Sequence, residues 1–212
     1  MSTVYLSTAY LAPVAYYKAL CHYDRTVIEA CSHYVKQSYR NRCTIAGPDG
    51  ELALSIPTVK PDTLKCPMKD IRISDHGNWR HLHWNAIESA YNNTPFFEYY
   101  KDDFRPFYEK KYEFLIDFNE EICRLVCQLI DIQPNIERTS AYKMEFSAEE
   151  TDFRESIHPK KDFRTTDPEF SPQPYYQVFE SKLGFLPNLS IIDLLFNMGP
   201  ESLLVLKKPT RL

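Results

Sequence analysis

Hydrogen-bond donors suited to an anionic ligand gather in residues 33–42. The cations and tyrosines of this segment are Tyr34, Lys36, Tyr39, Arg40 and Arg42. Lysine and arginine hold phosphates and carboxylates through charge-assisted hydrogen bonds, and a tyrosine ring can stack on a base or a sugar. The alternative, which composition alone favours, is a solvated basic strand whose aromatic side chains pack inward.

Three histidines lie near Trp79 in the sequence, namely His76, His81 and His83. His81 and His83 are two residues apart, so on a helix they point to different sides and cannot form the i, i+4 pair of a helical zinc site. His83 falls on an apolar stripe. Such a histidine is most often buried and hydrogen-bonded, although a general base in a cleft would give the same pattern.

The six cysteines form no CxxC pair. Cys123 and Cys127 are four residues apart on a strong helical pattern, where buried thiols are favoured over a zinc site. Cys31 and His33 could form a nucleophile and base, but a catalytic Cys/His pair is usually assembled from distant segments. We therefore expect reduced thiols and no metal site.

The composition is that of an ordinary globular protein, with 212 residues, 25 Lys+Arg against 29 Asp+Glu and a net charge of −4. An acidic chain is poorly suited to a phosphate backbone, so nucleic-acid binding is disfavoured. The five glycines form neither GxGxxG nor a P-loop, which argues against those nucleotide sites. No apolar run is long enough to cross a membrane and no secretory signal is visible. We expect a cytoplasmic protein without a transmembrane segment, folded as one domain over residues 1–212.

The predicted fold class is α/β, with α+β as the alternative. In the strand-rich amino-terminal half, residues 4–11 and 26–31 favour strands with a helix from Pro13 between them. Residues 39–45 and 51–56 flank the turn signal Gly47-Pro48-Asp49-Gly50 and predict a β-hairpin.

The second half is predicted to be mostly helical, over residues 79–91, 95–104, 117–130 and 191–197. The expected helix caps are Asn78, Thr94, Asp117 with Glu120, and Ser190 with Asp193, and Pro106 should interrupt the second helix. Residues 141–174 lack a sustained period, apart from a possible strand at 144–146. They predict a long functional or mobile loop that could serve as a lid.

A series of short motifs, taken in order along the chain, resembles the WbqC-like family of bacterial proteins. The motifs are Tyr10-Leu11-Ala12-Pro13 with Tyr16-Tyr17, Asp24 before Val27-Ile28, Tyr34-Val35-Lys36, Asn41-Arg42, Ile56-Pro57, Trp79 with His83, Ala90-Tyr91 before Pro95-Phe96-Phe97, Asp117-Phe118-Asn119, and the run from Asn188 to Asn197. The resemblance covers nearly the whole chain, and the last run is its most specific part.

This resemblance implies a role in O-antigen-type surface-polysaccharide biosynthesis, as a transferase that adds an acyl or aminoacyl group to a nucleotide-linked amino sugar. The ligand residues that it implies are Lys36, Asn41, Arg42 and Asn188. Tyr39 or Trp79 would stack on the ligand, and His83 and Asp193 are the candidate catalytic groups. The ligand would be a small molecule such as a nucleotide sugar, whereas the cofactor and the oligomeric state stay open.

Two departures from the family pattern support a second hypothesis. Thr8-Ala9 stands where members often have Gln-Pro, and Ala30-Cys31 stands where they often carry an acidic pair. If those acids act as a base or as metal ligands, the chain would be a non-catalytic ligand-binding or assembly protein of the same pathway. A hydrolase that uses Cys31 is a third and weaker hypothesis.

Overall fold

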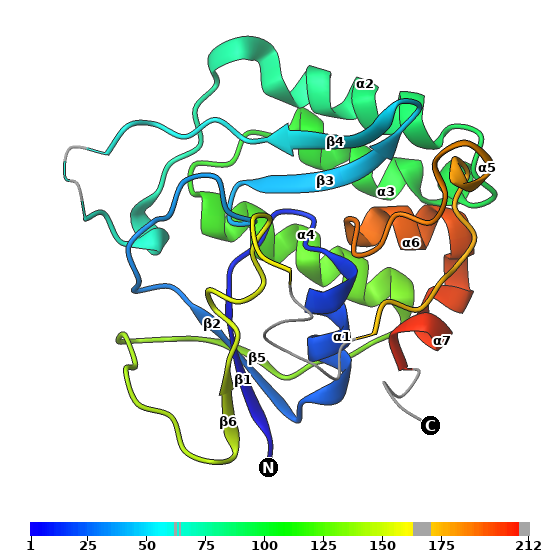
Figure 1. Cartoon of the computed structure of the whole chain (residues 1–212). Coiled ribbons are helices and arrows are strands. Elements are labelled where there is room, and N and C mark those ends of the chain that lie inside the picture. Colours follow the sequence, from blue (N-terminus) through cyan, green and yellow to red (C-terminus); the bar gives the residue numbers. More distant parts are fainter. Residues whose placement is uncertain (62, 64, 163–170, 208–212) are drawn as a thin grey trace.

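The computed structural model describes residues 1–61, 63, 65–162 and 171–207. It combines a parallel sheet, helices and a separate antiparallel hairpin, so the predicted α/β class is confirmed (Figure 1). The hairpin lies in the amino-terminal half, as expected. The second half is not purely helical, because it contributes two strands to the sheet.

The parallel sheet has the strand order β5-β2-β1-β6. β1 (Thr3–Ser7) leads through α1 (Val14–His22) to β2 (Arg25–Glu29), and the two strands pair in parallel along their whole length. Their residues are almost all buried, which is why apolar and β-branched residues mark them in the sequence. β5 (Ile136–Arg138) pairs with β2, and β6 (Glu150–Asp152) pairs with β1.

The hairpin consists of β3 (Arg42–Gly47) and β4 (Gly50–Ser55), in register from Arg42 opposite Ser55 to Gly47 opposite Gly50. Gly50 has a φ of 126°, which an L side chain rarely adopts. The predicted hairpin and its turn are therefore confirmed.

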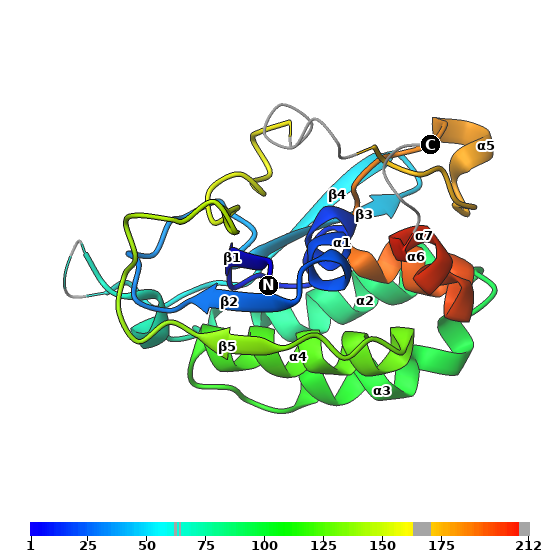
Figure 2. The same cartoon turned by 90° about the horizontal axis from the view of Figure 1, so that it is seen from below.

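Three long helices lie together beside the sheet (Figure 2). They are α2 (Trp79–Tyr91), α3 (Phe97–Glu109) and α4 (Leu115–Ile130), and single 3₁₀ turns, η1 (Met68–Asp70) and η2 (His76–Asn78), precede α2. The prediction that Pro106 interrupts the second helix is wrong, since α3 continues through it. Phe104 and Tyr108 are buried on either side of the proline, so their burial offsets the lost backbone hydrogen bond.

The predicted side-chain caps are wrong, although the helices are present. Asn78, Phe114 and Ser190 precede α2, α4 and α6 without any side-chain cap bond. Ser190 Oγ instead donates to the Leu11 carbonyl oxygen at 2.7 Å. A capping pattern shows only that a polar side chain can reach a free helix amide. Here a backbone carbonyl group from a distant part of the chain binds the Ser190 side chain instead.

The carboxyl-terminal part supplies α5 (Glu180–Leu183), α6 (Ile191–Met198), η4 (Gly199–Glu201) and α7 (Ser202–Lys207). Nearly all of α6 is buried, and Phe196 meets Tyr91, Phe97 and Phe104 edge to face, with ring centroids 5.2–5.4 Å apart. This aromatic cluster ties the end of the chain to α2 and α3.

The segment 141–174 contains β6, so part of the predicted loop belongs to the sheet. The possible strand at 144–146 is not formed. Residues 163–170 of this segment lie outside the described residues, and the lid stays a prediction.

Candidate functional site

The four parallel strands end at one edge of the sheet, which is where open α/β sheets usually bind their ligands. Polar side chains stand at or just after each strand end, namely Thr8 after β1, Glu29 in β2, Thr139 after β5 and Arg154 after β6. These side chains mark the candidate site.

A buried ion-pair network joins the ends of β2 and β6. Arg154 Nη1 donates to Glu29 Oε2 at 2.9 Å, and Arg154 Nε and Nη2 each donate to one oxygen of Asp152 at 2.8 Å. Glu29 is 0% exposed, and its other oxygen accepts bonds from Thr139 Oγ1 and the amides of Cys31 and Ser32. Both carboxylate oxygens of Glu29 are thus engaged in holding the edge together.

Sequence reasoning missed Glu29 and Arg154. Only positions 30 and 31, where members of the family often carry an acidic pair, were considered in the sequence. The buried carboxylate lies one residue earlier, inside the strand. The available signal was a glutamate within the otherwise apolar run Val27-Ile28-Glu29-Ala30, since a buried acid is rarely found without a partner. The partner itself comes from 125 residues further along the chain.

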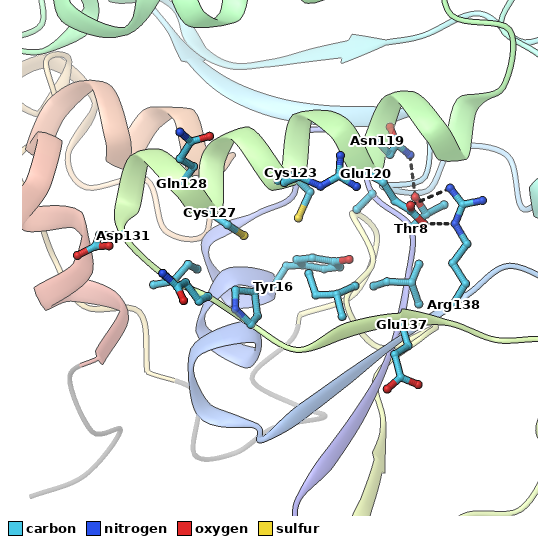
Figure 3. A pocket seen from close by; sticks show the side chains of 17 residues that line it. Thr8, Tyr16, Asn119, Glu120, Cys123, Cys127, Gln128, Asp131, Glu137 and Arg138 are labelled. Carbon is cyan, nitrogen blue, oxygen red and sulfur yellow. Dashed lines mark hydrogen bonds and ion pairs between the residues drawn. The ribbon is translucent and has the colours of Figure 1, made fainter.

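A cavity of about 460 Å³ adjoins this edge, between α4 on one side and β5 with the end of β2 on the other. We call it the α4–β5 cavity. Figure 3 shows Cys123 and Cys127 of α4 facing Tyr16 of α1 across it, with Arg138, Glu120 and Thr8 at one end. The cavity therefore carries its thiols in the middle and polar side chains at both ends.

Hydrogen bonds fix the end of the α4–β5 cavity at which Arg138 lies. Asn119 Nδ2 donates to Thr8 Oγ1 at 3.2 Å and to the Arg40 carbonyl oxygen at 2.8 Å. Arg138 Nη2 donates to Asp117 Oδ1 and to Glu120 Oε2, both at 2.7 Å. The predicted capping residues Asp117 and Glu120 thus bind Arg138 of β5 instead of a helix amide.

The two thiols of the α4–β5 cavity interact with each other. A hydrogen bond with Cys127 lowers the pKa of Cys123, and a bond with the Tyr17 hydroxyl acts in the same direction. The same thiol pair raises the pKa of Cys127.

The predicted ligand residues of segment 33–42 do not converge on the α4–β5 cavity. Lys36 is exposed, and Arg42 Nε donates to Ser55 Oγ across the hairpin at 3.0 Å. Asn41 Nδ2 donates to the Ile56 carbonyl oxygen at 2.9 Å, which fixes the start of the hairpin.

Tyr39 and Asn188 are brought together, because both line a second cavity of about 190 Å³. Burial raises the pKa of Tyr39 to about 12. Asn188, at a φ of 57°, accepts a bond from the Ala15 amide at 2.9 Å, so its side chain also positions the start of α1.

His83 and Trp79 lie in the core. His83 is 5% exposed, its Nδ1 lies 3.0 Å from the Tyr10 hydroxyl, and burial lowers its pKa to about 4. Trp79 Nε1 donates to the Ser74 carbonyl oxygen at 3.0 Å. Both side chains are therefore buried in the core and hydrogen-bonded there, each to its own partner.

Asp193 is a fully buried carboxylate in α6. It accepts hydrogen bonds from the hydroxyls of Tyr91 and Tyr175 and from Gln177 Nε2, at 2.8–2.9 Å. Burial raises its pKa to about 6, against the opposing effect of these three donors. Asp193 and His83 bond to separate partners, so they do not form a catalytic pair with each other.

Within the described residues, no three histidine, cysteine, aspartate or glutamate side chains gather to bind a metal ion. The six cysteines all lie within the described ranges and carry no disulfide. None of the helices among these residues has the length and apolar character needed to cross a membrane.

Comparison with known proteins identifies the family. Over 207 residues the chain is 24% identical to "Uncharacterized protein Rv1507c" of Mycobacterium tuberculosis (strain ATCC 25618 / H37Rv), covering 88% of this chain and 89% of that protein. No solved structure matches the chain. Residues 8–161 match the model of the WbqC-like protein family. The matched residues span most of the sheet, the hairpin and helices α1 to α4, so the chain belongs to the WbqC-like protein family.

Proposed function

We propose that this WbqC-like protein acts in the cytoplasm in bacterial surface-polysaccharide biosynthesis of the O-antigen type, and that it binds a small metabolite in the α4–β5 cavity. The observation that carries the proposal is the cavity itself. It runs between α4 and β5, from the loop before β5 to the carboxyl end of that strand, and has a volume of about 460 Å³. Metabolite pockets usually measure about 300–1,000 Å³.

The proposed reaction is transfer of an acyl or aminoacyl group to a nucleotide-linked amino sugar. The thiol-bearing part of the cavity suits the acyl chain. The Thr8 hydroxyl, which accepts a bond from Asn119, can donate its own hydrogen to the acyl carbonyl oxygen. With an acyl-CoA thioester as the donor, the amine forms a C–N bond to the acyl carbon, the C–S bond breaks and the CoA thiolate leaves. The proton of the attacking amine passes to Glu120, which lines the cavity. We propose Glu120 as this base in preference to His83, which is buried outside the cavity.

Ligand binding is tested by thermal shift with nucleotide sugars, acyl-CoA thioesters and divalent metal ions. A ligand at one hundred times its dissociation constant stabilises the folded protein by about 2.7 kcal/mol. We expect Cys123→Phe to weaken binding at least about tenfold, which corresponds to about 1.4 kcal/mol, because the phenyl ring occupies space in the cavity that the ligand needs.

The matched control is Cys66→Phe, which makes the same change in a different cavity lined by residues between 59 and 72. Binding that survives Cys123→Phe and is lost in the control would remove the α4–β5 cavity as the site.

Turnover is tested separately from binding. We expect Glu120→Gln to reduce transfer about a hundredfold while ligand binding persists, because general base catalysis contributes about 10²–10⁴-fold. Unchanged turnover in this variant would exclude Glu120 as the base.

A non-catalytic role in the same pathway is the second candidate function. It is favoured by the double contact of Arg138 with Glu120, since both carboxylate oxygens of the proposed base are already bonded to the guanidinium. A ligand that binds the purified protein without being converted, for every donor and acceptor pair offered, would support this alternative.

A further inference from the structure

Arg40 is the buried cation of segment 33–42. It is 2% exposed, whereas Lys36 is exposed and Arg42 is partly exposed on the hairpin. Arginine is almost never fully buried unless its charge is paired and its donors are bonded. The bonding of Arg40 therefore decides whether it is a structural residue or part of a site.

The guanidinium of Arg40 is incompletely bonded. Its Nη2 donates to Glu155 Oε1 at 2.5 Å, but its Nε is buried and has no hydrogen-bond partner among the described residues. A guanidinium has five N–H donors arranged to bind an oxyanion through two parallel bonds. One donor suited to such a contact is thus unused, and leaving it so costs free energy.

Arg154, which is also buried among the described residues, shows what complete bonding looks like. Arg154 directs Nε, Nη1 and Nη2 to the carboxylates of Asp152 and Glu29, so each nitrogen of its guanidinium has a partner. The two arginines are similarly buried, at 2% and 5% exposed. Burial alone therefore does not explain the unused donor of Arg40.

Glu155 is an exchangeable partner. Its side chain is 55% exposed, while that of Arg40 is 2% exposed, so the carboxylate covers the guanidinium on a side open to solvent. Glu155 follows β6 and belongs to no helix or strand. Its replacement by another oxyanion would therefore break no regular backbone hydrogen bonding.

We propose that Arg40 anchors an oxyanion site and that Glu155 is an internal competitor, displaced when a phosphate or carboxylate group of a ligand takes its place. Asn119 fixes the position of Arg40 by bonding its carbonyl oxygen. The site does not depend on what the α4–β5 cavity binds.

The test compares wild type with Glu155→Gln during titration with inorganic phosphate at constant ionic strength. If the free guanidinium is available for about a tenth of the time, removing the competing carboxylate raises the apparent affinity about tenfold. The readouts are the melting temperature and the Nε–H NMR signal of Arg40, which Arg40→Lys assigns. A parallel titration with acetate distinguishes a carboxylate ligand from a phosphate.

The matched control is Glu113→Gln, which removes the same charge and another arginine–carboxylate pair, to the exposed Arg72. We expect its phosphate midpoint to equal that of wild type. Equal midpoints for all three proteins would overturn the proposal. So would an Arg40 Nε–H signal that stays in place at saturating phosphate in Glu155→Gln, a variant that leaves Arg40 itself intact.

Discussion

Replacing Arg154 with methionine is expected to lower the free energy of unfolding by about 3–5 kcal/mol, as is usual when one partner of a buried ion pair is removed. Glu29 would keep its bonds to Thr139 and to two backbone amides but lose the only cation bonded to it among the described residues. Methionine keeps an unbranched apolar stem like the aliphatic part of arginine but removes the guanidinium group, and the same truncation is made in the control below. The measurement is urea unfolding at neutral pH.

The control for this prediction is Arg25→Met. Arg25 pairs with Glu137 at 2.7 Å, but the two side chains are 39% and 48% exposed. Exposed pairs contribute about 0–1 kcal/mol, because water screens both charges. Equal losses in the two variants would show that the Glu29–Arg154 pair does not stabilise the sheet edge in the way we describe.

We expect the stability deficit of Asp193→Asn relative to wild type to be largest at acid pH. Between pH 4 and pH 7 this difference in the free energy of unfolding should shrink by about 3 kcal/mol. Burial raises the pKa of Asp193 from 3.8 to about 6. Between these values the folded carboxyl binds a proton that the unfolded one has lost, so wild type loses stability as the pH rises. A shift of about two units corresponds to about 3 kcal/mol, and asparagine does not titrate.

The quantity to measure is the difference in the free energy of unfolding between Asp193→Asn and wild type at each pH, because His83 also contributes to the pH dependence. Burial lowers its pKa from 6.5 to about 4, so its contribution is complete above pH 6.5 and is lost as the pH falls through 4. In wild type the two groups oppose each other over nearly the same range. The variant retains the His83 effect, which therefore cancels in the difference.

Asp49→Asn is the control for the pH prediction, since Asp49 is exposed at the hairpin turn and pairs with Lys182. Its difference from wild type, measured from pH 4 to pH 7, is the baseline for the same exchange at an exposed site. A constant difference for Asp193→Asn would contradict the raised pKa of the Asp193 carboxyl.

The elements that were predicted correctly have local causes. The hairpin follows from the turn at 47–50 between two alternating segments, and α2 and α4 follow from apolar side chains at helical spacing. β5 and β6 were missed because each has three residues and is mostly exposed or half-buried. Such segments become strands only because β2 and β1 offer them unpaired backbone groups.

The candidate site could be predicted only in part. Donor-rich segment 33–42 was recognised from composition, but only the structure distinguishes buried Arg40 from exposed Lys36. Glu155, Asn119 and Arg154 were not proposed as site residues, because they lie 79–125 residues from their partners Arg40 and Glu29. No pattern in a single sequence encodes such pairings.

The sequence by itself determined the family, the α/β class and the position of the long helices and of the hairpin, because these depend on residue order and on periodicity within one segment. Only the tertiary structure decided which polar side chains are buried, which are bonded and where a cavity remains. Those properties depend on the few side chains that approach one another at the carboxyl edge of the sheet. A carboxylate such as Glu29 or Asp193 therefore acquires its role from neighbours that the sequence places far away.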